Sequence, residues 1–200
     1  MTTFLKFYVL IYIIFYLSII KVIRTFLRSK KIGVKLTTFG RKPGSVHDYV
    51  GFLFKMTHSL TLAILLINVF YEFNKIRFLD NLFVQILGII LSIFAFWLSI
   101  CAQNNLGESW RLGIDEIVQT RLITTGLYNV SRNPFFTGML LSLFSLFLLL
   151  PTYIMGFLFI LSFVTVNIQI RLEEEHHTRV HGDKYMDYKN RVNRFIPKWN

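Results

Sequence analysis

Residues 133–170 read NPFFTGMLLSLFSLFLLLPTYIMGFLFILSFVTVNIQI, and none of these 38 positions carries a formal charge. As one α-helix at 1.5 Å per residue the stretch would be about 57 Å long, whereas bilayer hydrocarbon is about 30 Å thick. That length is too great for one crossing and suits two. Leu150, Pro151 and Thr152 fall at its middle, where a proline ends one helix and allows the next to begin. The stretch therefore predicts a tight hairpin of two transmembrane helices.

Earlier apolar segments have the length of membrane spans, which is roughly 20 residues. They are residues 4–23, 50–71 and 81 to about 102. Lys6 and Lys21 lie near the ends of the first segment, where long side chains reach the headgroups. A signal peptide is the alternative for this segment, but its positive region is a single Lys and no small-residue cleavage site follows. The sequence predicts an all-α integral membrane protein with five transmembrane helices.

The composition agrees with a membrane protein. Of the 200 residues 54% are hydrophobic and 16% are charged, and the mean hydropathy is +0.51. A chain with 21 Phe, 4 Pro and 11 Gly is neither disordered nor collagen-like. Cys101 is the single cysteine, which excludes an intrachain disulfide framework.

The net charge is +11, from 22 Lys and Arg against 11 Asp and Glu. Taken alone, this charge could indicate nucleic acid, acidic substrates or the inner face of a bilayer. Segments 24–49, 103–134 and 171–200 contain seven, three and seven of the basic residues, and with five spans all three lie on one side. The positive-inside rule then places the N-terminus outside and the C-terminus in the cytoplasm. This topology accounts for most of the charge without nucleic acid.

Residues 1–200 are expected to form one membrane domain, with three spans in 1–102 and the polar complexity in 103–200. The loop 103–134 has more residues than a simple connection between two helices needs, so we expect it to fold over another part of the protein or a bound group. The tail begins as a continuation of the last helix. Tyr185 and Tyr188 are spaced three apart and share a helix face.

Several kinds of site can be tested against these segments. A Rossmann G-x-G-x-x-G, a Walker loop and a G-x-S-x-G elbow do not occur in the sequence. His177 and His181 stand at i and i+4, with Glu173 and Glu174 one turn earlier, which is a spacing that can chelate zinc. The alternative is a solvated, charge-rich helix face, and because H-E-x-x-H does not occur no metal is predicted.

Glu173 and Glu174 have two interpretations. Acidic residues at a membrane-level helix end are often interfacial, and ion pairing with Arg171 would account for them. Alternatively, they bind a cationic or hydroxylated ligand beside the bilayer.

Five short motifs, in this order and spacing, are similar to a known family. They are RLITTGLY at 121–128, SRNPFFTG at 131–138, RLEE at 171–174, GDKYMDY at 182–188 and RVNRFIP at 191–197. They resemble the integral-membrane methyltransferases that include isoprenylcysteine carboxyl methyltransferase and the phospholipid N-methyltransferases. That family has a Leu-Val-Thr-Ser-Gly-Pro-Tyr run leading to Arg-His-Pro-x-Tyr-x-Gly, followed by Arg-x-Glu-Glu, Gly-x-x-Tyr-x-x-Tyr and a closing basic-proline motif. The resemblance covers about half of the chain, residues 106–197.

The resemblance implies S-adenosylmethionine as methyl donor, in a cytoplasmic pocket closed by the loop before the fourth helix and by the C-terminal tail. It implies backbone contacts to the adenine end from 120–123, a turn over the cofactor at 133–136, and a carboxylate on the ribose or amino end. The implied cofactor-binding residues are Thr120, Arg121, Leu122, Ile123, Tyr128, Asn133, Pro134, Phe135, Phe136, Glu173 and Glu174. The candidate catalytic residues are Arg171, to bind a carboxylate of cofactor or substrate, and Glu174.

The chain departs from the family pattern at two positions. Asn133 stands where the family usually has His, and Phe136 where it usually has Tyr. An Asn keeps a polar contact but cannot carry a proton, so the resemblance does not extend to a histidine base here. An acceptor carboxylate or thiolate needs no base, whereas an amine or phenol must lose a proton. The sequence leaves these acceptors open.

The expected partners are the lipid bilayer and a lipid-like or small hydrophobic acceptor, and no nucleic acid. A lipid-like acceptor could enter sideways between spans. Lys55 and His58 lie one turn apart in the second span and would be costly facing lipid. Either Lys55 reaches the interface and His58 hydrogen-bonds within the bundle, or both face the acceptor.

Two other functions compete. Membrane sterol reductases have a similar C-terminal half and bind a nicotinamide cofactor, but they are generally longer, with more spans. A non-enzymatic scaffold with a basic inner face would attract anionic lipid. Five spans and the Glu173–Glu174 pair favour the methyltransferase.

Overall fold

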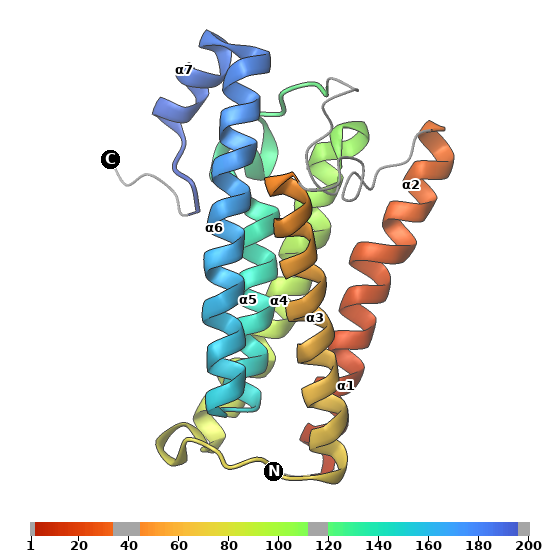
Figure 1. Cartoon of the computed structure of the whole chain (residues 1–200), viewed down its shortest axis with the longest axis vertical. Helices are drawn as coiled ribbons and strands as arrows, with labels where there is room; N and C mark the ends of the chain where they lie inside the picture. The colour runs from red at the N-terminus through yellow and green to blue at the C-terminus, as the bar shows by residue number, and fades with distance from the viewer. Residues whose placement is uncertain (1–2, 34–44, 112–119, 196–200) are drawn as a thin grey trace.

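The computed structural model describes residues 3–33, 45–111 and 120–195, and long helices make up most of these ranges. The helices run side by side as a bundle, with α7 folded across one end (Figure 1). A π-helical segment, Ser18–Ile23, joins α1 and α2 into one continuous rod. The helices are α1 (Thr3–Leu17), α2 (Arg24–Ile32), α3 (Val46–Phe70), α4 (Leu82–Leu106), α5 (Pro134–Leu149), α6 (Tyr153–His181) and α7 (Asp183–Arg191).

Within the described ranges, four helical segments are long and apolar enough to cross a membrane, and each covers a predicted span. They are Thr3–Lys31, Asp48–Phe70, Leu82–Ser109 and Tyr153–His181. The fifth, α5, is apolar but has only 16 residues. Its length is about 24 Å, short of the roughly 30 Å of hydrocarbon. The prediction of five spans is therefore confirmed only in part.

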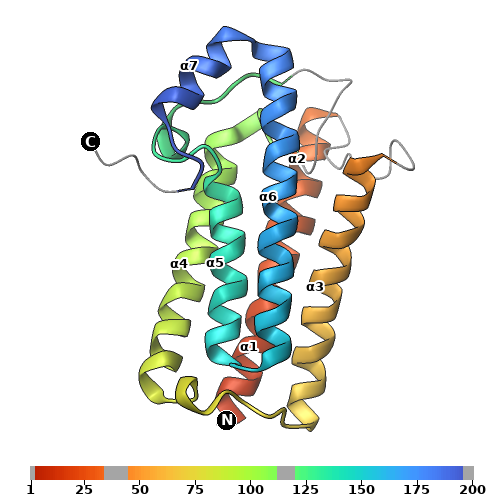
Figure 2. The same ribbon diagram turned by 60° about the vertical axis from the view of Figure 1, so that its left-hand side comes forward.

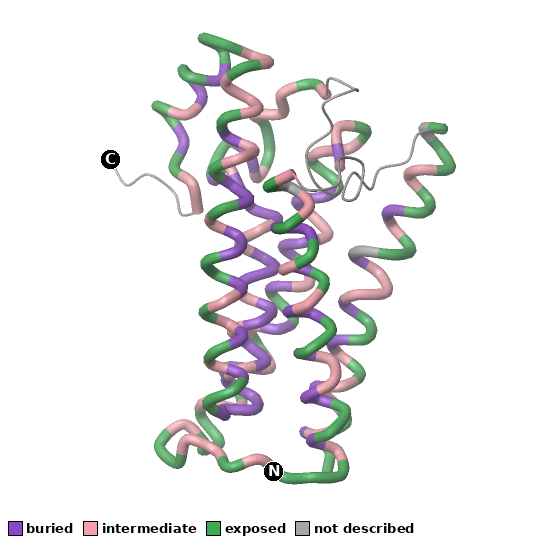
Figure 3. Tube along the Cα trace, in the orientation of Figure 1, coloured by how far each residue is buried: buried purple, intermediate pink, exposed green. Residues whose placement is uncertain are grey.

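The short helix lies inside the bundle. In Figure 2, α5 stands between α4 and α6. Most of its side chains are buried, and Figure 3 shows the buried residues gathered along the facing sides of the central helices, with exposed residues on the outer sides. Because α5 is covered largely by protein, its length does not have to match the bilayer.

The helix hairpin predicted around Pro151 is confirmed, although α6 alone of its two helices has the length of a membrane span. Leu149 ends α5, Pro151 lies in the connection, and the Thr152 hydroxyl caps α6 by accepting a hydrogen bond from the Met155 amide at 3.3 Å. The Pro151 carbonyl accepts another from the Ile76 amide at 2.7 Å. The hairpin is thus tied to the connection between α3 and α4, at the end of the bundle opposite α7 (Figure 1).

Close packing of α4 on α5 depends on Gly138. A Cβ at this position would lie 2.5 Å from the Ser99 hydroxyl and 3.1 Å from the Ser99 amide nitrogen. Small residues let membrane helices approach and polar side chains join them. The Ser99 hydroxyl also shares a 2.8 Å hydrogen bond with the Tyr16 hydroxyl, and Tyr12 donates to the Ser142 hydroxyl at 3.0 Å. These bonds hold α1 against α4 and α5.

Candidate functional site

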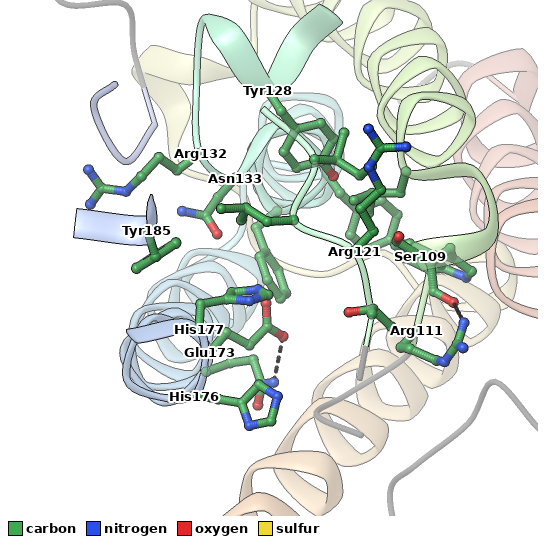
Figure 4. A pocket seen from close by; sticks show the side chains of 18 of the residues that line it. Ser109, Arg111, Arg121, Tyr128, Arg132, Asn133, Glu173, His176, His177 and Tyr185 are labelled. Carbon is green, nitrogen blue, oxygen red and sulfur yellow. Dashed lines mark hydrogen bonds between the residues drawn. The ribbon is translucent and has the colours of Figure 1, made fainter. Parts of the chain in front are cut away.

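A cavity of about 240 Å³ lies at the end of the bundle beneath α7, where α4 ends and α5 begins. Its walls come from α3, the end of α4, α5, α6 and the two segments that flank residues 112–119, and tyrosines of α7 help to line it. The polar described residues on its wall include Lys55, Ser109, Arg111, Arg121, Arg132, Asn133, Gln169, Glu173, His176 and His177. Figure 4 shows Glu173 reaching from α6 toward the middle of this space, across from the segment that carries Ser109 and Arg111.

Among the residues that the structure describes, one side chain donates a hydrogen bond to the Glu173 carboxylate. Gln169, one turn earlier on α6, donates from Nε2 to Oε1 of Glu173 at 2.7 Å. Among the described residues, no basic side chain forms an ion pair with it. A carboxylate on a buried wall is stabilised by cations or hydroxyl donors, so this group is suited to bind either.

Several other polar atoms on the wall lack hydrogen-bond partners among the described residues. Examples are the indole Nε1 of Trp110, Oε1 of Gln169 and Nδ1 of His177, which are buried and have no hydrogen-bond partner in the described part of the chain. Unpaired buried polar atoms cost about 1–3 kcal/mol each, and they are rare unless a ligand or water completes them. Several such atoms on residues around one cavity indicate a place where a polar ligand binds.

Aromatic rings supply the rest of the wall. Trp110 packs edge-on against Phe135, with ring centroids 4.5 Å apart, and Phe136 stacks on Phe54 at 6.4 Å. Burial, together with the nearby Glu173 carboxylate, raises the pKa of the Tyr128 phenol well above its ordinary value. At neutral pH Tyr128 is therefore an uncharged hydroxyl rather than a base.

The roof of the cavity is fastened by the turn before α5. Arg132 donates through Nη2 to Oε1 of Glu174 at 2.7 Å and through Nη1 to the Lys189 carbonyl at 3.0 Å. Tyr188 on α7 donates its hydroxyl to the Tyr128 carbonyl at 2.6 Å. Asn133 donates from Nδ2 to the Arg194 carbonyl at 3.2 Å. These contacts hold α7 and the following segment over the cavity.

The structure brings most of the residues named from the sequence to one place. Those that line the cavity are Thr120, Arg121, Leu122, Ile123, Tyr128, Asn133, Phe135, Phe136 and Glu173. Pro134 is buried at the first turn of α5 and is not among the described lining residues.

Arg171 and Glu174 lie elsewhere. Both line a second hollow on the outer side of α6. The Glu174 carboxylate is held by Arg132 and by Arg194, whose Nη2 lies 2.8 Å from Oε2. Arg171 does not pair with Glu173 or Glu174 in the structure, so the two adjacent acids have different surroundings and different partners.

Lys55 and His58, which are one turn apart on α3, also have different surroundings. Lys55 is exposed and lines the cavity. His58 is buried, and its Nδ1 lies 2.7 Å from the Phe54 carbonyl of the same helix. His58 therefore hydrogen-bonds within the bundle, whereas Lys55 faces the cavity.

The histidine spacing on α6 does not assemble a metal centre in the described part of the chain. The His177 ring stacks on His181 with centroids 5.6 Å apart, and it also lies beside the rings of His176 at 5.9 Å and Tyr185 at 5.3 Å. No cluster of three or more metal-ligating side chains occurs among the described residues.

Sequence reasoning missed several residues of the wall, among them Trp110, Gln169 and His177. Gln169 could have been found, because it precedes Glu173 by four residues and so shares its helix face. Trp110 carried no such signal, since its position depends on how the chain turns after α4.

One comparison with known proteins gives a match. A family model described as phospholipid methyltransferase matches residues 83–184, about half of the chain, from α4 into α7. The matched range includes most of the cavity wall. No curated protein matches the chain.

Proposed function

Because the chain belongs to the phospholipid methyltransferase family, we propose that it transfers a methyl group from S-adenosylmethionine to a lipid-like or small acceptor that reaches it through the membrane. The acceptor group is a carboxyl, an amine or a thiol. The observation that carries the proposal is the position of Glu173, a carboxylate on the cavity wall with no cationic partner among the described residues.

The chemistry of the wall fits S-adenosylmethionine, which supplies a methyl group on a positively charged sulfur. Glu173 would accept hydrogen bonds from the ribose hydroxyls or the amino end. Trp110 would donate its free indole N–H, and the rings of Phe135 and Phe136 would lie beside the cationic or planar parts of the donor. Backbone groups of 120–123 would hold the adenine.

The chain's own task is to align the two reactants and exclude water, because methyl transfer is an in-line displacement. The roof made by Tyr128, Tyr185 and Tyr188 shields the cavity from solvent, since all three side chains are buried. Lys55, on the membrane-spanning helix α3, is placed to meet an acidic group of the acceptor.

We further propose that residues 103–200 form the donor-binding half and that 1–102 supply three spans, of which α3 contributes to the cavity. The bundle end with the cavity would face the cytoplasm, since most basic residues lie at that end.

Donor binding tests the proposal directly. We expect S-adenosylhomocysteine to bind the purified chain saturably in calorimetry, and Glu173→Gln to weaken binding about tenfold or more, because a hydrogen bond to a charged group contributes about 1.5–3 kcal/mol. Glu175→Gln, an exposed acid on the same helix, is the matched control and should bind normally. Binding of NADPH instead would indicate a reductase.

The acceptor can be found with a radiolabelled methyl donor. Membranes that contain the chain are incubated with it, and the product is separated into lipid, protein and volatile fractions. Label in one fraction, absent with Glu173→Gln, identifies the acceptor class. If Glu173→Gln binds S-adenosylhomocysteine as tightly as the parent chain, the site assignment is wrong.

A further inference from the structure

A second hollow, of about 520 Å³, lies on the outer side of α6, away from the cavity. Its lining includes four basic side chains, from Arg171, Arg179, Lys189 and Arg194, which we call the basic groove. We propose that the basic groove binds the phosphate of an anionic phospholipid. This proposal does not depend on methyl transfer.

The groove has more positive than negative charge. One acid in it, Glu174, already pairs with Arg132 at 2.7 Å and with Arg194 at 2.8 Å. Arg171 and Arg179 are exposed, and in the described part of the chain neither forms an ion pair or a side-chain hydrogen bond. Among the described residues that line the groove, the one acid besides Glu174 is Glu175, which is itself exposed. An anion placed here would meet two cations that no described side chain satisfies.

The position on α6 separates this groove from the cavity. A helix turns about 100° per residue, so Arg171 and Glu173, two residues apart, point in nearly opposite directions, about 160° apart around the axis. Glu173 faces the cavity, and Arg171 therefore faces outward. A ligand in the groove would not touch the cavity wall that holds Glu173.

The surface below the groove is apolar, which favours a lipid over a free phosphate. Ile160, Val164 and Ile168 follow one another by four residues on the same face as Arg171, and their exposed fractions are 62%, 49% and 38%. Just beside them, Phe195 stacks on Phe163 with ring centroids 6.5 Å apart. Acyl chains can lie along this strip while the phosphate meets Arg171, at the point where the apolar run of α6 ends.

Charge also favours an anionic lipid. Lys and Arg near an anionic leaflet contribute about 1 kcal/mol each, and the groove lies at the more basic end of the bundle. A zwitterionic lipid carries its own cation and would gain less.

The test compares two lipids on one protein. The full chain in detergent is mixed with equal amounts of dioleoyl phosphatidylglycerol and dioleoyl phosphatidylcholine, and native mass spectrometry measures the bound ratio. We expect a preference for phosphatidylglycerol that falls about tenfold in the double variant Arg171→Gln, Arg179→Gln. The control is Lys30→Gln, Lys31→Gln, two exposed cations on α2, and it should keep the preference.

A second variant guards against misfolding. Glu175→Gln removes the opposing acid, so it should raise the preference, which a damaged fold would not do. Millimolar inorganic phosphate should fail to displace the bound lipid. An unchanged ratio in the Arg171 and Arg179 variant, an equal loss in the α2 control, or displacement by phosphate would each overturn the proposal.

Discussion

Arg132 and Glu174 form an ion pair with Nη2 and Oε1 2.7 Å apart, and both side chains are almost completely buried. The pair joins the turn before α5 to α6. Arg194 binds the second carboxylate oxygen at 2.8 Å, so the segment after α7 is drawn to the same point. Glu174 is therefore the centre of the fastening that closes the cavity.

Glu174→Gln should destabilise the fold strongly. Removing one partner of a buried ion pair leaves the other charge uncompensated, at a cost of about 3–5 kcal/mol. Arg132 and Arg194 would both lose their anion. We expect a clear fall in the midpoint of thermal unfolding, followed by circular dichroism in detergent. Glu175→Gln, one residue away and exposed, should change the midpoint little, and equal shifts in the two variants would contradict this role for Glu174.

Trp110→Phe should separate ligand binding from stability. Phenylalanine keeps an aromatic ring against Phe135 but removes the unpaired indole N–H. We expect S-adenosylhomocysteine to bind several-fold more weakly, because one hydrogen bond contributes about 0.5–1.5 kcal/mol. The unfolding midpoint should stay the same or rise, since an unsatisfied buried donor is lost.

The matched control for Trp110 is Trp97→Phe, at an exposed tryptophan in the middle of α4. It should leave binding unchanged in the same calorimetric titration. Unaltered affinity in Trp110→Phe would show that the indole N–H does not contact the ligand.

Much of the fold follows from local sequence signals. The charge-free run and Pro151 were enough to predict the hairpin, because helix length and proline chemistry are local properties. The shortness of α5 was not predicted, although Pro134 and Leu150 bound it, since apolar composition alone does not distinguish a lipid-facing span from one surrounded by protein. The π-helical segment was not predicted either. Gln103 of α4 donates a hydrogen bond to the Ile20 carbonyl within this segment at 2.9 Å, and a contact between residues so distant in sequence leaves no local signal.

In the site too, some features follow from local sequence and others depend on residues distant in sequence. The motif Arg-x-Glu-Glu names two adjacent acids, and the sequence could not tell which one faces the cavity. The difference comes largely from residues distant in sequence, because Arg132 and Arg194 form ion pairs with the Glu174 carboxylate. Glu173 instead accepts a hydrogen bond from Gln169 on the same helix. Only the last contact was accessible to reasoning from helical spacing.

Gly138→Ala should loosen the contact between α4 and α5. The added methyl group would lie 2.5 Å from the Ser99 hydroxyl and 3.2 Å from the Ala95 carbonyl oxygen, both on α4. Overpacking of this kind costs about 1–3 kcal/mol. Gly156→Ala on α6 is the control, because its nearest neighbour would be the Phe147 ring edge at 3.3 Å, which can move. A smaller fall in the unfolding midpoint for Gly138→Ala than for Gly156→Ala would refute this packing argument.

Tyr188→Phe should weaken the roof, and the effect should depend on pH. The variant loses the 2.6 Å hydrogen bond to the Tyr128 carbonyl, which contributes about 1 kcal/mol, whereas Tyr185→Phe loses no hydrogen bond seen in the described chain and is the control. Burial raises the pKa of Tyr188 from 10.0 to about 12. Its contribution to stability is therefore complete below pH 10 and is lost as pH rises toward 12. Unfolding midpoints of the parent chain and Tyr188→Phe should differ at neutral pH and converge over that window, and a constant difference would show that ionisation of Tyr188 is not coupled to the fold.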